Sequence, residues 1–176
     1  MPDIARSHPP TPGPSLVPAL TALAAEAEAA GYMDIADWAR CEAEGYRGDV
    51  PPYRRVAAGR VRGFAEASGW QPLPDDPAAI HGLTAGVADL EAAVAAAREG
   101  LASVRLDDAA RAAAAFGGRF VEVVASVDVR DLQSLLFSVA SLADRWRSQI
   151  AARTTLAGVP AGRAAGARRA TVGVRA

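Results

Sequence analysis

The most regular feature of the chain is a recurrence of apolar residues at every third or fourth position between residues 80 and 104. These positions are Ile80, Leu83, Val87, Leu90, Val94, Ala97, Leu101 and Val104. Side chains at this spacing lie along one stripe of an α-helix, and so regular a stripe is buried against another helix. The pattern therefore predicts a long helix that begins at Asp76 and Pro77 and ends near Ser103.

Two further apolar stripes follow, and each predicts another long helix. The first helix is expected over residues 108–126 and the second over residues 128–153. The connections between the three helices are short, so consecutive helices should run antiparallel. We therefore expect residues 78–153 to form a three-helix antiparallel bundle that resembles a coiled coil.

The N-terminal half shows three shorter helical patterns. They cover residues 16–31, where Gly31 is placed to end the helix, residues 33–44, and residues 52–68. Together they predict a helical subdomain over residues 15–69, joined to the bundle by a proline-rich linker over residues 70–77. The predicted fold class is therefore all-α.

Composition predicts that both ends of the chain lack regular structure. Residues 1–14 are rich in proline, which favours a disordered or polyproline-like tail. Residues 154–176 are rich in Ala, Gly and Arg and contain no acidic residue, which predicts a disordered basic tail.

Charge and composition narrow the chemistry of this chain of 176 residues. Its 19 basic residues are all arginine, so any lysine-dependent chemistry is excluded, and its formal net charge is −1. A single cysteine, Cys41, cannot form an intramolecular disulfide. No apolar run approaches the roughly 18 residues that a membrane span needs, and the start of the chain does not resemble a signal peptide. We therefore expect a cytoplasmic protein that does not bind a membrane.

Arginines supply the main candidate for nucleic-acid contact. In the predicted helix over residues 52–68, three of them fall on one polar face, and three more lie in the C-terminal tail. They are Arg54, Arg55, Arg62, Arg163, Arg168 and Arg169. A net charge of −1 provides little of the field that drives phosphate binding, so we expect any such contact to be weak.

Arg60 is placed differently, because helical geometry puts it among the apolar residues of the same predicted helix. Its stem can extend outward along that surface, or it can form a buried ion pair with a carboxylate of the preceding helices. The candidate partners are Asp34, Asp37 and Glu42.

Motifs for catalysis, metals and cofactors are missing from the sequence. The two histidines are His8, in the proline-rich tail, and His81, and there is no Gly-x-Ser-x-Gly elbow. His and Cys do not occur at metal-ligand spacings, and no glycine-rich phosphate loop follows a strand. We therefore expect no cofactor, no metal and no catalytic residue.

Partner binding is the function that most of these features favour. Leu135, Leu136 and Phe137 follow one another and cover more than one face of their helix, which suggests an apolar interface patch. The leading hypothesis is a non-enzymatic helical module for protein–protein interaction or self-association. The alternatives are a nucleic-acid-associated or regulatory protein that uses the arginines above, and an enzyme with a site around Arg60.

Overall fold

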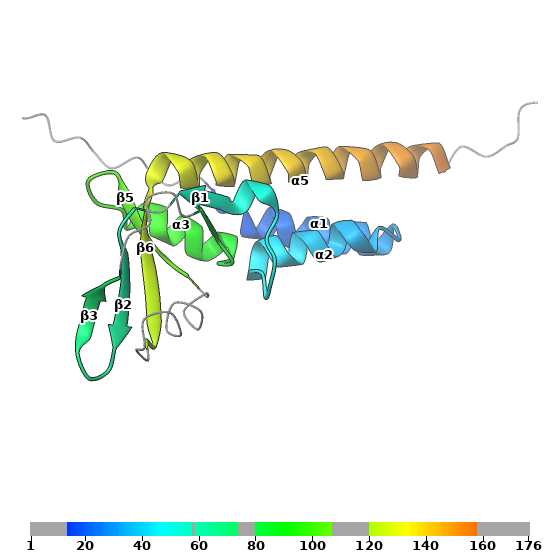
Figure 1. Cartoon of the computed structure of the whole chain (residues 1–176). Coiled ribbons are helices and arrows are strands. Elements are labelled where there is room, and N and C mark those ends of the chain that lie inside the picture. The colour runs from blue at the N-terminus through cyan, green and yellow to red at the C-terminus, as the bar shows by residue number, and fades with distance from the viewer. Residues whose placement is uncertain (1–13, 58, 74–79, 107–119, 158–176) are drawn as a thin grey trace, which may run out of the picture.

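The computed structural model describes residues 14–57, 59–73, 80–106 and 120–157, and within these ranges the protein is a mixture of helices and strands (Figure 1). The elements, in chain order, are α1 (Val17–Ala29), α2 (Met33–Glu44), the 3₁₀ turn η1 (Pro52–Arg54), β1 (Arg55–Ala57), β2 (Val61–Ala65), β3 (Gly69–Pro72), β4 (Ile80–Gly82), α3 (Val87–Ala95), β5 (Leu101–Arg105), β6 (Glu122–Asp128) and α5 (Val129–Ala157). No described helix is long and apolar enough to cross a membrane.

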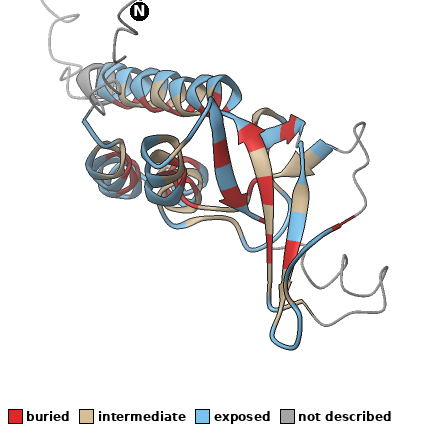
Figure 2. Cartoon of the chain, turned by 90° about the vertical axis from the view of Figure 1, so that its left-hand side faces the viewer, coloured by how far each residue is buried: buried red, intermediate tan, exposed pale blue. Residues whose placement is uncertain are grey.

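The strands form two antiparallel sheets. The larger sheet has the order β3-β2-β6-β5, and the smaller one pairs β1 with β4. Buried and more exposed residues alternate along the long strands, as Figure 2 shows, so one face of the larger sheet belongs to the core. The opposite face is not covered by any described helix, and we call it the open sheet face.

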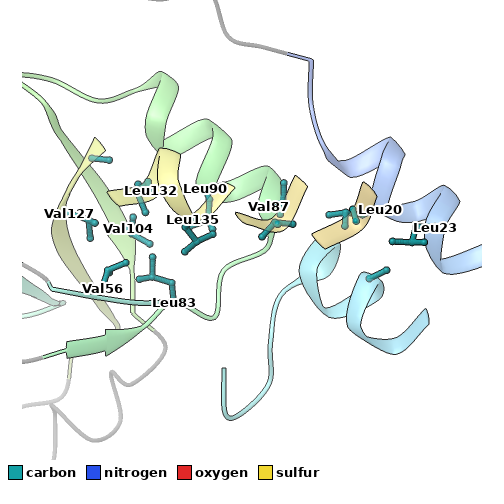
Figure 3. Close-up of a cluster of buried hydrophobic side chains, with 14 of the residues drawn as sticks. Leu20, Leu23, Val56, Leu83, Val87, Leu90, Val104, Val127, Leu132 and Leu135 are labelled. Carbon is teal, nitrogen blue, oxygen red and sulfur yellow. The ribbon is translucent and has the colours of Figure 1, made fainter. Parts of the chain in front are cut away.

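The helices cover the inner face of the larger sheet and extend beyond it. α5 runs the length of the molecule, with α3 and the sheets beneath its N-terminal half and the α1–α2 pair beneath its C-terminal half (Figure 1). Figure 3 shows Leu90, Leu132 and Leu135 packed beside Val104 and Val127, while Leu20 and Leu23 continue the core toward α2. Burial of these side chains contributes about 1.5–3 kcal/mol each.

The predicted all-α, coiled-coil-like bundle is wrong, and the segment over residues 80–104 shows why. Only α3, in its middle, is helical; β4 precedes it and β5 follows it. Leu83, Val87 and Leu90 are fully buried as the stripe predicted, but along β5 the burial alternates, with Ala102 and Val104 inside and Leu101 outside. An apolar spacing of three or four residues cannot distinguish one long helix from a short helix flanked by strands. The helix ends at Ala95, and Glu99 and Gly100, both with positive φ, form the tight turn between Arg98 and Leu101 that leads into β5.

The helix predicted over residues 52–68 is also wrong, because this segment forms η1, β1 and β2. Val56 is buried between exposed neighbours, which is the two-residue period of a strand. Gly59 and Gly63 disfavour a helix, and Gly63 leaves room for the ring of Phe120 against the core face of the sheet.

The third error concerns the helix predicted over residues 108–126. Residues 107–119 lie outside the described residues, but the following segment is β6, in which Val123, Ala125 and Val127 are buried and alternate with partly exposed residues. A valine-rich run with this period favours a strand over a helix.

The remaining helices are confirmed. The stripe over residues 16–31 forms α1, with Gly31 in the left-handed conformation just after it, and α2 covers residues 33–44. α5 begins one residue after the predicted start and continues through Ala157, four residues into the predicted tail. Residues 1–13, residues 74–79, which include the second half of the predicted linker, and residues 158–176 lie outside the described residues.

Candidate functional site

An ion pair between Arg54 of η1 and Glu42 of α2 lies at the centre of the N-terminal half. Both side chains are fully buried, and Nη2 of Arg54 lies 2.6 Å from Oε2 of Glu42. Nε of Arg54 donates to the same carboxylate at 3.1 Å. Nη1 donates to the backbone carbonyls of Leu83 and Ala85 at 2.9 and 2.7 Å. The arginine therefore joins α2 to the segment before α3.

Two tyrosines also donate hydrogen bonds to the Glu42 carboxylate. The hydroxyls of Tyr46 and Tyr53 each donate to Oε1 of Glu42 at 2.5 Å, and the Tyr53 hydroxyl accepts from Nε1 of Trp38 at 2.8 Å. The ring of Tyr46 lies under the guanidinium of Arg54, with 4.9 Å between Cζ and the ring centroid. We call these five residues, Trp38, Glu42, Tyr46, Tyr53 and Arg54, the Glu42 cluster.

Burial and the Glu42 carboxylate keep both phenols of the cluster protonated. Burial, followed by the hydrogen bond to Glu42, raises the pKa of Tyr53 to about 12. The same causes, in the same order, raise the pKa of Tyr46 well above its usual range. Within the described part of the chain, every buried side-chain nitrogen and oxygen has a hydrogen-bond partner. The cluster is therefore a fully hydrogen-bonded polar core.

Two glycines let the backbones meet beside the Glu42 cluster. Gly45, at the end of α2, has a φ of 103° and forms an isolated bridge with Ala85. A Cβ at Gly86 would lie 2.6 Å from the carbonyl oxygen of Ala43. This close approach brings the Leu83 and Ala85 carbonyls to Arg54.

The structure places two of the predicted arginine sites, Arg54 and Arg60, differently from what the sequence predicted. Arg54 was expected on an exposed polar face and is fully buried. Arg60, for which an outward stem or a buried ion pair was expected, is exposed between β1 and β2, where its backbone carbonyl accepts from the Ser126 amide at 2.9 Å. Its candidate partner Glu42 is taken by Arg54, and Asp37 pairs with Arg40. The sequence did not indicate that Arg54, and not Arg60, pairs with Glu42, because this pairing depends on the 3₁₀ turn at residues 52–54.

The open sheet face holds an exposed aromatic pair with an arginine over it. Trp70 of β3 is 41% exposed, and it lies opposite Phe64 of β2 with the ring centroids 5.4 Å apart. Cζ of Arg62, two residues before Phe64 on the same face, lies 5.7 Å from the Trp70 ring. The sequence pattern indicated Arg62 as a candidate but neither ring. A strand signal was present, because Arg62 and Phe64 alternate with the smaller Val61, Gly63 and Ala65, and Gly69 marks a turn after them.

A second arginine lies on the same face across β6. Arg105 of β5 and Arg62 of β2 are both paired in register with Val124, one on each side of it. Directly opposed residues have Cβ atoms about 5 Å apart, so the two arginine stems begin about 10 Å from each other. Arg55 is also exposed, but it lies on β1 in the smaller sheet.

A cleft of about 670 Å³ lies between the end of α2, α3 and the β5–β6 part of the larger sheet. Arg105, Ser103 and Val124 line it on the sheet side, and Tyr46 and Arg47 line it on the other. Its wall also carries the acidic residues Glu44, Asp89 and Glu122. Arg105 therefore lines the same cleft as Arg47 and also flanks Val124 opposite Arg62.

The remaining predicted site residues are separated from these features. Leu135 is buried, Leu136 is partly buried and Phe137 is 73% exposed, so the expected apolar patch on α5 is reduced to Phe137. Arg163, Arg168 and Arg169 lie outside the described residues. His81 is on β4, and within the described ranges no three His, Cys, Asp or Glu side chains are grouped to hold a metal ion.

These features define an α+β protein whose antiparallel sheet has helices on one face and an aromatic–arginine surface on the other. The chain belongs to the AbiTii family, since the AbiTii family model matches residues 16–153. Neither a curated protein nor a solved structure matches the chain. The matched range contains both the Glu42 cluster and the open sheet face.

Proposed function

We propose that this protein acts in abortive infection, the toxin-like role that its AbiTii family suggests, by binding single-stranded nucleic acid on the open sheet face. The proposal is of a binding protein and not of an enzyme. The observation that carries it is the group formed by Arg62, Phe64 and Trp70, in which an exposed ring and a guanidinium share one flat surface.

This arrangement matches how proteins bind unpaired nucleic acid. Bases stack on exposed aromatic rings, which is worth about 1–3 kcal/mol per base, and arginines contact the backbone phosphates. A duplex keeps its bases stacked on each other, so a ring on a sheet surface is accessible only to a single strand. Arg62 and Arg105 flank Val124, and Arg105 also lines the cleft that holds Arg47, so we propose that the backbone contacts these three arginines.

Charge sets the expected strength of this binding. The net charge of −1 and the acidic residues of the cleft oppose a long contact with phosphates. If Arg62 and Arg105 neutralise two phosphates, the logarithm of the binding constant falls with the logarithm of salt concentration with a slope of about −1.4. We therefore expect modest affinity and moderate salt dependence.

Fluorescence anisotropy with a labelled oligothymidine of about ten nucleotides tests the proposal. We expect Trp70→Leu to weaken binding about tenfold, because it removes a stacking ring from an exposed position. Arg145→Gln on α5, an exposed arginine away from the sheet, is the matched control and should bind as the unmodified chain does. Equal binding by Trp70→Leu and the unmodified chain would reject the open sheet face as the interface.

A protein-binding role is the second candidate, and Phe137 favours it. An aromatic side chain that is 73% exposed on the outer side of a long helix is a common anchor of protein interfaces. If the chain associates with itself there, Phe137→Ser should lower the molecular mass measured by light scattering at high protein concentration. If the unmodified chain and Phe137→Ser both have the mass of a monomer, self-association through Phe137 is rejected.

A further inference from the structure

A second surface site lies between α2, η1 and α5, away from the open sheet face. It is a pocket of about 280 Å³ lined by three aromatic side chains, Trp38, Tyr53 and Trp146, together with the carboxylate residue Asp34. Asp34 and Trp38 are four residues apart on α2, so they lie on the same face of that helix. Asp34 is exposed, whereas Trp38, Tyr53 and Trp146 are partly buried.

The walls of this pocket are held in place by the Glu42 cluster. Nε1 of Trp38 donates to the Tyr53 hydroxyl at 2.8 Å, and that hydroxyl donates to the buried carboxylate of Glu42 at 2.5 Å. Trp146 comes from the other side, one turn after Leu142 on α5. The rings of Trp38 and Tyr53 are therefore preorganised, which reduces the entropy lost when a ligand binds.

The chemistry of the lining selects a planar cation. Aromatic faces attract guanidinium groups, and a carboxylate accepts their paired N–H donors. Elsewhere in this molecule the same contact occurs at Tyr46, Trp70 and Tyr32, each of which has an arginine Cζ beside one ring face, 4.9, 5.7 and 5.4 Å from the centroid. Among the described residues, no arginine lies over Trp38, Tyr53 or Trp146.

We infer that this pocket binds an arginine side chain of a basic peptide segment in a protein partner. Its volume of about 280 Å³ is just below the roughly 300–1,000 Å³ of drug-sized ligand sites, so it suits a single side chain. Its negative charge and aromatic walls complement a guanidinium, while the open sheet face carries arginines of its own. The inference does not depend on the proposed nucleic-acid binding, since the two sites share no residue.

The three tryptophans of the chain provide a direct test, because each contributes one indole N–H signal to a proton–nitrogen NMR spectrum. The full-length protein is titrated with a blocked Gly-Arg-Gly peptide, after single Trp→Phe variants have assigned the signals. We expect the Trp38 and Trp146 signals to shift and the Trp70 signal to stay in place. The matching peptide with lysine should bind more weakly, and the one with uncharged citrulline should not bind detectably.

Variants distinguish a cation site from an apolar crevice. Asp34→Asn should weaken binding of the arginine peptide about threefold or more, because it removes the exposed carboxylate that pairs with the guanidinium. Asp37→Asn is the matched control on the same helix; it pairs with Arg40, does not line the pocket and should leave binding unchanged. The inference is overturned if no indole signal shifts, if citrulline binds as well as arginine, or if Asp34→Asn binds as well as Asp37→Asn.

Discussion

At the scale of single residues, the Glu42 cluster shows how a protein with a small alanine-rich core uses buried charge. A buried ion pair contributes little net stability relative to apolar residues of the same size, because both ions lose their hydration. Here the carboxylate accepts from an arginine and two phenols, and the remaining arginine donors reach backbone carbonyls. A different arrangement of α2, η1 and the segment before α3 would leave some of these buried donors and acceptors unpaired, which costs about 1–3 kcal/mol for each group.

Removing one partner of this cluster should be severe. Glu42→Gln leaves the guanidinium of Arg54 buried without its counter-ion, and we expect the free energy of unfolding to fall by about 3–5 kcal/mol in urea denaturation. Glu28→Gln is the control, because it breaks an ion pair with Arg40 that is exposed at the surface, and it should cost less than about 1 kcal/mol. If Glu42→Gln and Glu28→Gln lowered the unfolding free energy by a similarly small amount, the result would contradict a buried ion pair between Arg54 and Glu42.

The raised tyrosine pKa values predict how stability depends on alkaline pH. Both phenols keep their protons in the folded protein at a pH where the unfolded chain, with a tyrosine pKa of about 10, has lost them. The unfolding free energy should therefore be unaffected by these groups below pH 10 and fall as the pH rises from about 10 through 12.

The double variant Tyr46→Phe/Tyr53→Phe should show a smaller fall in chemical denaturation over this range. Tyr32→Phe, which alters a tyrosine outside the cluster, should keep it. If the double variant and the unmodified chain lost stability in parallel as the pH rose, the raised pKa values would not hold.

At the scale of elements, the sequence was a good guide to helices and a poor one to strands. α1, α2 and α5 are long enough for a 3.6-residue stripe to repeat several times, and their ends carry clear signals such as Gly31. β1, β3 and β4 are only three or four residues long, which is too short to establish a two-residue period. In β5 and β6 the alternation is present, but alanine and serine between the valines also fit a helix.

The strand assignment of β6 can be tested by one substitution. In a helix with Phe120, Val123 and Val127 inside, Ala125 would point outward and accept a charge. In the strand, Ala125 is fully buried, so Ala125→Asp should lower the unfolding free energy by about 3 kcal/mol or more. Ser126→Asp, on the open sheet face next to it, should cost much less, and equal tolerance of both changes would favour the helix.

At the scale of the whole molecule, the candidate site depends on pairings between distant segments. Arg62, Phe64 and Trp70 come together through the β2–β3 hairpin, but Arg105 joins them only because β6 pairs with both β2 and β5. Sequence analysis selected Arg62 as a candidate for nucleic-acid contact, yet it placed the residue on a helix and included the buried Arg54. The register between β2 and β6, which lie about 60 residues apart in the sequence, is set by tertiary packing, and a single sequence carries no local signal for it.

The same long-range packing separates two surfaces that the sequence could not resolve. The open sheet face combines rings with arginines, whereas the pocket beside α5 combines rings with Asp34. The two surfaces should therefore prefer ligands of opposite charge, and each contains its own tryptophan reporter.

Nucleic-acid binding on the open sheet face can be tested by titrating the nitrogen-labelled full-length protein with an oligothymidine of about ten nucleotides while following the three indole N–H signals. We expect the Trp70 signal to shift, the shift to weaken as salt is added, and the Trp38 and Trp146 signals to stay in place. A Trp70 signal that does not move at saturating oligonucleotide would contradict nucleic-acid binding on the open sheet face.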